Sequence, residues 1–381
     1  MRAVLRLARR ARSVYNKEER GGKSVNIFDY LQRQGARRFD ELPFSVLDGL
    51  ILARLSYLPF ESLLAPQQEA RLADVGARLL ETPELTASVR QKKDLRLLAA
   101  LLACARYRDL LLFGCVAHRE SEMQFFALTA VFSQCFVSFR GTDNTLAGWK
   151  EDFNMSFTCP IPSQTLAVSY LEGVAAHVTG DILIGGHSKG GNLAVYAAAC
   201  CGAQTQARIR SVWNFDGPGF DERVLLTDGY RAVCDRVHTF VPQSSVVGML
   251  LEHEEDYTIV RSRQHGILQH DLYSWQVEGE GFVCLETVNH SSRFLDHTIK
   301  SWVAGMDYAK RQKVVDAVYD LLLQTDAATQ TELTTHWFYG AWRALRSMKN
   351  LDEETRASVV EALRLLAGSA KASLLVVVKD W

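Results

Sequence analysis

The stretch Gly186-His187-Ser188-Lys189-Gly190-Gly191-Asn192 decides the fold that this sequence predicts. It fits the pattern G-x-S-x-G, which occurs where a strand turns sharply into a helix. The apolar run 182–184 before it is typical of a strand, and the alanine-rich run 193–199 after it is typical of a helix. Glycines two residues either side of the serine let the backbone turn without collision. The pattern predicts a nucleophilic Ser188; the alternative is a purely structural glycine turn.

Strands and helices alternate along the chain on both sides of this turn. Two aromatic and β-branched runs joined by a polar pair, 125–132 and 135–139, predict a hairpin. Further strands are expected at 211–215 and 237–241, and helices at 166–178, 189–201 and 222–234. Short connections between such elements favour an α/β fold with a mostly parallel central sheet and flanking helices.

Four segments follow from the changes in pattern along the chain. They are a basic N-terminal tail (1–23), a helical N-terminal segment that packs on the core (24–114), an α/β core (115–304) and a helical C-terminal segment (305–381).

Composition excludes several classes of protein. The 381 residues carry 43 Lys+Arg against 44 Asp+Glu, a balance that argues against a dedicated nucleic-acid binder. Eight dispersed cysteines form no Cys-x-x-Cys pair, which indicates buried free thiols rather than disulfides or a zinc site. No apolar run is long enough to span a membrane, so we expect a cytoplasmic protein.

The basic stretch 1–20 lacks the apolar core of a signal peptide. Its scattered apolar residues would allow peripheral contact with an anionic membrane, and the alternative is a solvated tail.

A second motif lies upstream of the serine. Phe139-Arg140-Gly141-Thr142-Asp143 ends a predicted strand, and a tight turn there would offer the backbone N–H of Thr142 to an oxyanion. The backbone N–H of Lys189, the residue after the nucleophile, would be the second donor. We expect Arg140 to form a buried ion pair with Asp152 that braces this turn.

These motifs together resemble the class 3 (fungal-type) lipases, and more closely an uncharacterised bacterial α/β-hydrolase family related to them. The likeness covers about 125–275 and includes Asn214-Phe215-Asp216-Gly217-Pro218-Gly219-Phe220. It implies an α/β-hydrolase fold, hydrolysis of acyl esters, and triad residues in the order Ser, Asp, His. Where those lipases carry Leu, this chain has Lys189. Its cation either favours an anionic substrate or points to solvent.

The general base must then follow Ser188 in the chain. The candidates are His238, His253, His265, His270, His290, His297 and His336. His238 falls within a predicted apolar strand, where a core role is expected, and His297 and His336 fall in predicted helices. The loop 264–272 follows the last clear central strand, and there His270-Asp271-Leu272-Tyr273 resembles the His-x-x-Tyr of the lipases. We therefore favour His270 over His265.

The acid departs from the lipase pattern. The resemblance implies an Asp after the strand ending at Val241, but the chain has no carboxylate there until Glu252. Asp216 ends the neighbouring strand and can reach the same imidazole, because adjacent strands lie about 5 Å apart. Asp216 is the first choice and Glu252 the second; the alternative for Asp216 is an Asx turn. A further possibility is that Ser245 orients the imidazole through its hydroxyl.

The sequence therefore predicts a serine hydrolase that cleaves a small-molecule or lipid-like ester. Its alternative is a catalytically inactive binding or scaffold protein on the same fold, because a fold does not prove activity. No phosphate loop or dinucleotide fingerprint occurs, so no cofactor is expected. The acidic run 252–256 resembles a metal site, but a solvated acidic turn is the expected reading, and no metal is predicted.

Overall fold

The structure is a computed structural model that describes part of the chain. The described residues are 25–120, 123–142, 151, 154–155, 158–243, 245, 247–248, 253–264, 266–286, 310, 312–313, 317, 353–354 and 356–360. The predicted basic tail, most of the predicted C-terminal helical segment, Glu252 and the alternative base His265 lie outside them. Within the described part, no helix has the length and apolar character needed to cross a bilayer.

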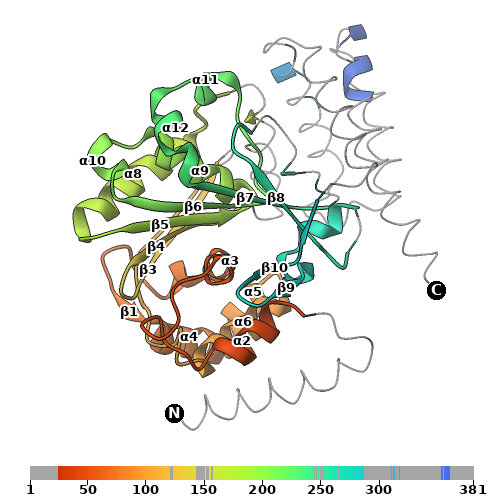
Figure 1. Cartoon of the computed structure of the whole chain (residues 1–381). Helices are drawn as coiled ribbons and strands as arrows, with labels where there is room; N and C mark the ends of the chain where they lie inside the picture. Colours follow the sequence, from red (N-terminus) through yellow and green to blue (C-terminus); the bar gives the residue numbers. More distant parts are fainter. Residues whose placement is uncertain are drawn as a thin grey trace, which may run out of the picture.

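A twisted sheet forms the centre of the described molecule (Figure 1). Its strands, in spatial order, are β1 (Ala70–Arg71), β2 (Leu111–Arg119), β3 (Gln124–Val131), β4 (Cys135–Phe139), β5 (Ile182–His187), β6 (Ile209–Phe215), β7 (Val237–Pro242), β8 (Tyr257–Val260) and β11 (Cys284–Leu285). The central strands β4 to β8 run parallel, whereas the pairs at both edges are antiparallel. The predicted hairpin is the pair β3–β4, and β9 (Val277–Glu278) with β10 (Gly281–Phe282) forms a second, separate hairpin.

Helices cover both faces of the sheet (Figure 1). One face carries α2 (Ile27–Gln34), α3 (Val46–Leu55), α4 (Leu72–Glu81), α5 (Pro83–Ser88) and α6 (Lys92–Ala103). The other carries α8 (Pro162–His177), α9 (Lys189–Cys200), α10 (Ala203–Gln206), α11 (Glu222–Leu225) and α12 (Asp228–Val233). Single 3-10 turns are η1 (Phe60–Ser62), η2 (Cys234–Arg236), η3 (Gly266–His270) and η4 (Leu272–Ser274). This architecture confirms the predicted α/β fold class.

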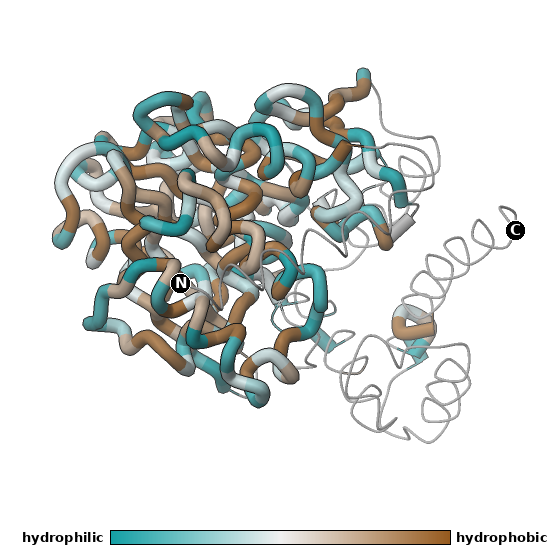
Figure 2. Tube along the Cα trace, turned by 90° about the horizontal axis from the view of Figure 1, so that it is seen from below, coloured by the Kyte–Doolittle hydropathy of each residue, from teal (hydrophilic) through white to brown (hydrophobic). Residues whose placement is uncertain are grey.

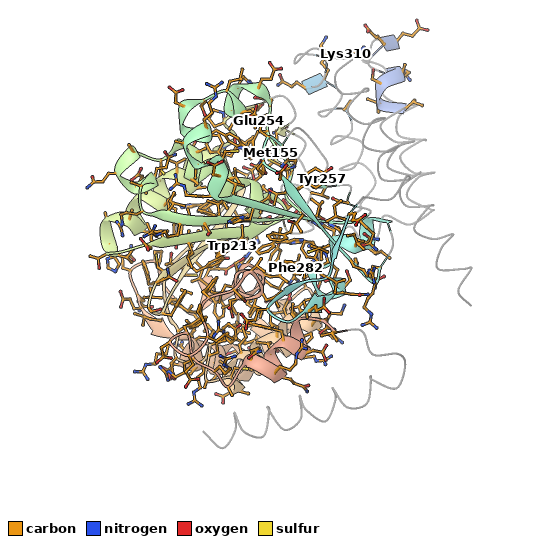
Figure 3. All side chains as sticks on the ribbon, in the orientation of Figure 1. Met155, Trp213, Glu254, Tyr257, Phe282 and Lys310 are labelled. Atoms are coloured by element: carbon orange, nitrogen blue, oxygen red, sulfur yellow. The ribbon has the colours of Figure 1, made fainter. Side chains whose placement is uncertain are left out.

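The alternation of side chains along the strands explains the two helical layers. In β5, Leu183 belongs to the core shared with α2, α3, α4 and α6, while Ile182 and Ile184 belong to the core shared with α8 and α9. Successive strand residues point to opposite faces, so a strand that is apolar throughout must be covered on both sides. Trp213 of β6 (labelled in Figure 3) packs on Phe44 on the side of the N-terminal helices. Hydrophobic stretches recur throughout the described part of the chain (Figure 2).

Two buried ion pairs hold the N-terminal helical layer together. Arg106 donates to both carboxylate oxygens of Asp48, at 2.8 and 2.7 Å. Arg54 donates to both oxygens of Asp94, at 2.6 and 2.7 Å, and the Tyr273 hydroxyl donates to Asp94 at 2.7 Å. Tyr273 follows the predicted base by three residues, so the second pair ties the loop of that base to the helical layer.

Three sequence expectations need correction here. The helix expected over 222–234 is two helices, because the Thr227 hydroxyl accepts a hydrogen bond from the Tyr230 N–H and starts α12 anew. The eight cysteines are free, as expected, but Cys200 and Cys284 are exposed rather than buried. His238, expected in the core, is also exposed.

Candidate active site

Ser188 stands in the turn between β5 and α9. Its backbone adopts φ +60° and ψ −134°, a left-handed conformation that non-glycine residues rarely adopt. Its N–H donates to Phe215 O at 2.9 Å, which ties the turn to the end of β6. Such strain persists only where the surroundings impose it, and it clusters at functional sites.

The glycines around Ser188 are required by close backbone approach. A Cβ at Gly186 would lie 2.3 Å from the carbonyl carbon of Gly190, and a Cβ at Gly190 would lie 2.2 Å from Phe139 O. Both distances are far below contact, so neither position accepts a side chain. The steric reason that the sequence suggested for the two glycines therefore applies in the structure, and the end of β4 lies directly against the turn.

Asp216 directly follows β6 and contacts His270. The aspartate is 1% exposed, adopts φ +54°, and its N–H donates to Phe240 O at 2.8 Å. His270 Nδ1 lies 2.6 Å from Asp216 Oδ2, and the His270 side chain is 25% exposed. The residue pair expected from the neighbouring strand is thus brought together. The Ser245 hydroxyl, suggested as a further group to orient the imidazole, donates to Asp216 Oδ1 at 2.5 Å.

His187, which the sequence analysis passed over, fixes the backbone of His270. Its Nε2–H donates to His270 O at 2.9 Å, and its Nδ1 accepts from the Tyr57 hydroxyl at 2.9 Å. The two imidazole rings lie 4.3 Å apart between centroids. Burial, together with the neighbouring His270, holds the pKa of His187 well below its usual 6.5, so its ring is neutral. His187 precedes Ser188, whereas the general base of this fold follows the nucleophile, and no local pattern links 57 with 187.

Ser188 and His270 are not hydrogen-bonded to each other in the described structure; Ser188 is 9% exposed. Contacts of this kind often tighten only when substrate is bound. The hydrogen bond from His187 to the His270 carbonyl nonetheless keeps the loop that carries His270 beside the turn that carries Ser188.

Lys189 differs from both expectations for its side chain. Its ammonium group is buried and donates to Glu151 Oε2 at 2.5 Å and to Gln124 O at 2.8 Å. It therefore faces neither solvent nor a substrate. Its backbone N–H is at the first position of α9, where the amide has no partner within the helix, and no other described residue accepts it.

The loop after β4 lies next to the serine. A Cβ at Gly141 would lie 2.9 Å from Ser188 Cβ, and Thr142 follows it, half-buried. The expected partner of Arg140, Asp152, lies outside the described residues. Arg140 pairs with Glu61 through two contacts of 3.1 Å and donates to Ser56 O at 2.5 Å. The helical layer thereby supports the candidate oxyanion loop.

The acidic run after β7 is not a solvated turn throughout. His253 and Glu255 are buried against one another, with His253 Nδ1 2.9 Å from Glu255 Oε1. Among the described residues, no group of three or more potential ligands is arranged to hold a metal ion.

The model of the Mbeg1-like family matches residues 102–320, more than half of the chain. No curated protein sequence matches significantly. A solved structure with some likeness is the crystal structure of M37 lipase, which is 13% identical over 68% of this chain and 80% of that chain, with a TM-score of 0.36.

Proposed function

We propose that this chain, which belongs to the Mbeg1-like family, is a serine hydrolase that cleaves a carboxylic ester of lipid type. The observation that carries the proposal is the 2.6 Å contact between His270 and the buried Asp216, beside a serine held at φ +60°. A carboxylate behind an imidazole, next to a strained serine at a helix N-terminus, is the arrangement that activates a hydroxyl for acyl transfer.

In this mechanism the Ser188 hydroxyl attacks the ester carbonyl while His270 Nε2 takes the serine proton. The negative charge on the carbonyl oxygen is bound by the backbone N–H groups of Lys189 and Thr142. Asp216 keeps the proton on His270 Nδ1 and stabilises the imidazolium. His270 then gives its proton to the leaving alcohol, and an acyl-Ser188 ester remains. Water, deprotonated by His270, hydrolyses that ester and restores the serine.

The alternative is an inactive binding protein on the same fold. The sequence favoured this alternative because no carboxylate follows Val241 until Glu252. In the mechanism proposed above, Asp216 takes the place of that carboxylate, so its absence after Val241 no longer favours an inactive protein.

Hydrolysis of p-nitrophenyl esters of increasing acyl length tests the proposal. We expect turnover that Ser188→Ala abolishes and that Ser169→Ala, a change of an exposed serine on α8, leaves intact. A folded wild-type chain without turnover, or equal turnover in Ser188→Ala, would overturn the proposal. The acyl length at which kcat/KM peaks then gives the substrate class, and a short-chain optimum would replace lipid esters by small esters.

A further inference from the structure

Glu255 is the centre of a buried polar cluster behind Asp216. Its carboxylate accepts from the Tyr230 hydroxyl at 2.5 Å, from the Thr239 hydroxyl at 2.5 Å, and from His253 Nδ1 at 2.9 Å. Burial alone would raise the pKa of Glu255, but the hydrogen bond and charge of His253, with the two hydroxyls, lower it to about 2. The carboxylate is therefore ionised and can only accept hydrogen bonds.

His253 faces an acceptor at each ring nitrogen. Nδ1 faces the Glu255 carboxylate, and Nε2 lies 2.8 Å from Gly248 O. A neutral imidazole carries one N–H, whereas both contacts require a donor. Only an imidazolium donates to both acceptors at once. The His253 side chain is 6% exposed and that of Glu255 is 3% exposed, so the pair is buried.

Gly248 connects this pair to the acid of the candidate active site. Its N–H donates to Asp216 Oδ1 at 3.2 Å and to the Ser245 hydroxyl oxygen at 3.0 Å. A Cβ at Gly248 would lie 2.4 Å from Asp216 Oδ1, so the glycine backbone rests directly on the carboxylate. His253 contacts the carbonyl of Gly248, and the N–H of the same glycine contacts Asp216.

We propose that His253 is a positioning residue whose imidazolium, clamped by Glu255, fixes Gly248 on Asp216 and so sets the orientation of the carboxylate that binds His270. The inference rests on the proposed function. The segment after β7, which the lipase resemblance expects to supply the acid, here supplies the groups that hold an acid from β6. Oδ1 of Asp216 is used for this support, which leaves Oδ2 for His270.

Charge at 253 matters as much as shape. A glutamine at 253 has donors on one atom and an acceptor on the other, so one end of it would face an acceptor without a proton. His253→Gln therefore separates the two-sided donor from a side chain that merely fills space.

Nitrogen-15 NMR of the histidine rings tests the first half of the proposal without any activity measurement. In the full chain carrying Ser188→Ala, at neutral pH, we expect both ring nitrogens of His253 to be protonated. A neutral His253 ring would overturn the proposal. The same spectra report the His270 Nδ1 proton shared with Asp216, which resonates far downfield in such pairs. Failure of the proposed function would leave these signals intact, so the two outcomes are distinguishable.

Kinetics of His253→Gln test the second half. We expect kcat to fall about 10-fold to 100-fold, because small displacements of catalytic groups cost that much. KM should stay within about twofold, because no substrate contact is removed. The control is His238→Gln, the exposed histidine of β7, which should leave kcat and the His270 resonance unchanged. A folded His253→Gln chain with wild-type kcat and an unchanged His270 resonance would overturn the proposal. If that variant does not fold, the ring spectra of His253 decide.

Discussion

Asp48 and Asp216 are both buried carboxylates, yet their surroundings differ in kind. Asp48 accepts from Arg106, from the hydroxyls of Tyr30 and Tyr107, and from Ser45, all within the N-terminal helical layer. Asp216 accepts from Ser245 and Gly248 on one oxygen and contacts the partly exposed His270 with the other. The Asp48 carboxylate is fully buried with the permanently charged guanidinium of Arg106, whereas the Asp216 carboxylate contacts the partly exposed imidazole of His270.

The backbone conformations of Asp48 and Asp216 also differ. Asp48 is the third residue of α3, in a capping box with Ser45, and has ordinary helical geometry. Asp216 sits at φ +54° at the carboxyl edge of the sheet, one strand from Ser188 at φ +60°. A buried carboxylate in relaxed backbone with a closed partner set stabilises the fold. A buried carboxylate in strained backbone, aimed at a ring that meets solvent, is suited to chemistry.

The largest expected effect is on activity, at Asp216. We predict that Asp216→Asn lowers kcat about 10⁴-fold, since the imidazole loses the charge and the tautomer that Asp216 imposes. Ester hydrolysis by the purified variant measures this. As control, Asp271→Asn changes the aspartate next to His270, which pairs with Lys93 at the surface, and should leave kcat within about twofold. Equal losses in both variants would contradict the assignment of the acid.

The counterpart at Asp48 should affect stability. We predict that Asp48→Asn lowers the free energy of unfolding by about 3–5 kcal/mol, because the Arg106 guanidinium stays buried without its carboxylate. Urea denaturation followed by circular dichroism measures this. Asp181→Asn breaks an exposed pair with Arg210 and should cost at most about 1 kcal/mol. Loss of kcat without loss of stability in Asp48→Asn would remove the contrast between the two aspartates.

The pH dependence of stability sharpens the comparison at His187. Its pKa is below 6.5 in the folded chain and near 6.5 in the unfolded chain, so its contribution is present above pH 6.5 and is lost as the pH falls below it. Stability should therefore drop on acidification from about pH 7.5 to about pH 5.5, by up to about 1.4 kcal/mol per pH unit below 6.5. His187→Gln should flatten that drop, and His118→Gln on the exposed end of β2 should not. An unchanged slope in His187→Gln would refute the buried neutral ring.

The smallest effect is expected at Tyr57. Tyr57→Phe removes the hydrogen bond to His187 Nδ1 and should lower the free energy of unfolding by about 1 kcal/mol. Thermal denaturation compared with Tyr257→Phe, a change of an exposed tyrosine, measures it (Figure 3). A stability loss in the control equal to that in Tyr57→Phe would mean that the hydrogen bond is not the cause.

Sequence reasoning succeeded where a property is carried by neighbouring residues. The apolar and aromatic runs of the strands predicted the sheet, and the glycines at 186 and 190 predicted the turn, because both depend on local geometry. Asp216 was selected by its place directly after a predicted strand, and His270 by its loop after the last central strand together with the resemblance to the lipase His-x-x-Tyr. Contacts such as Tyr57 with His187, and His253 with Gly248, join side chains to partners that the fold alone selects. The error at Lys189 has the same origin, since its partner Glu151 is 38 residues away.

Covalent labelling tests the central claim most directly. The full chain is incubated with a fluorophosphonate, digested, and the peptides are analysed by mass spectrometry for the phosphonylated residue. We predict one dominant adduct on Ser188, formed far more slowly when Asp216 is replaced by Asn. An unmodified Ser188 in folded protein, or an adduct on another serine instead, would contradict the assignment of Ser188 as the nucleophile.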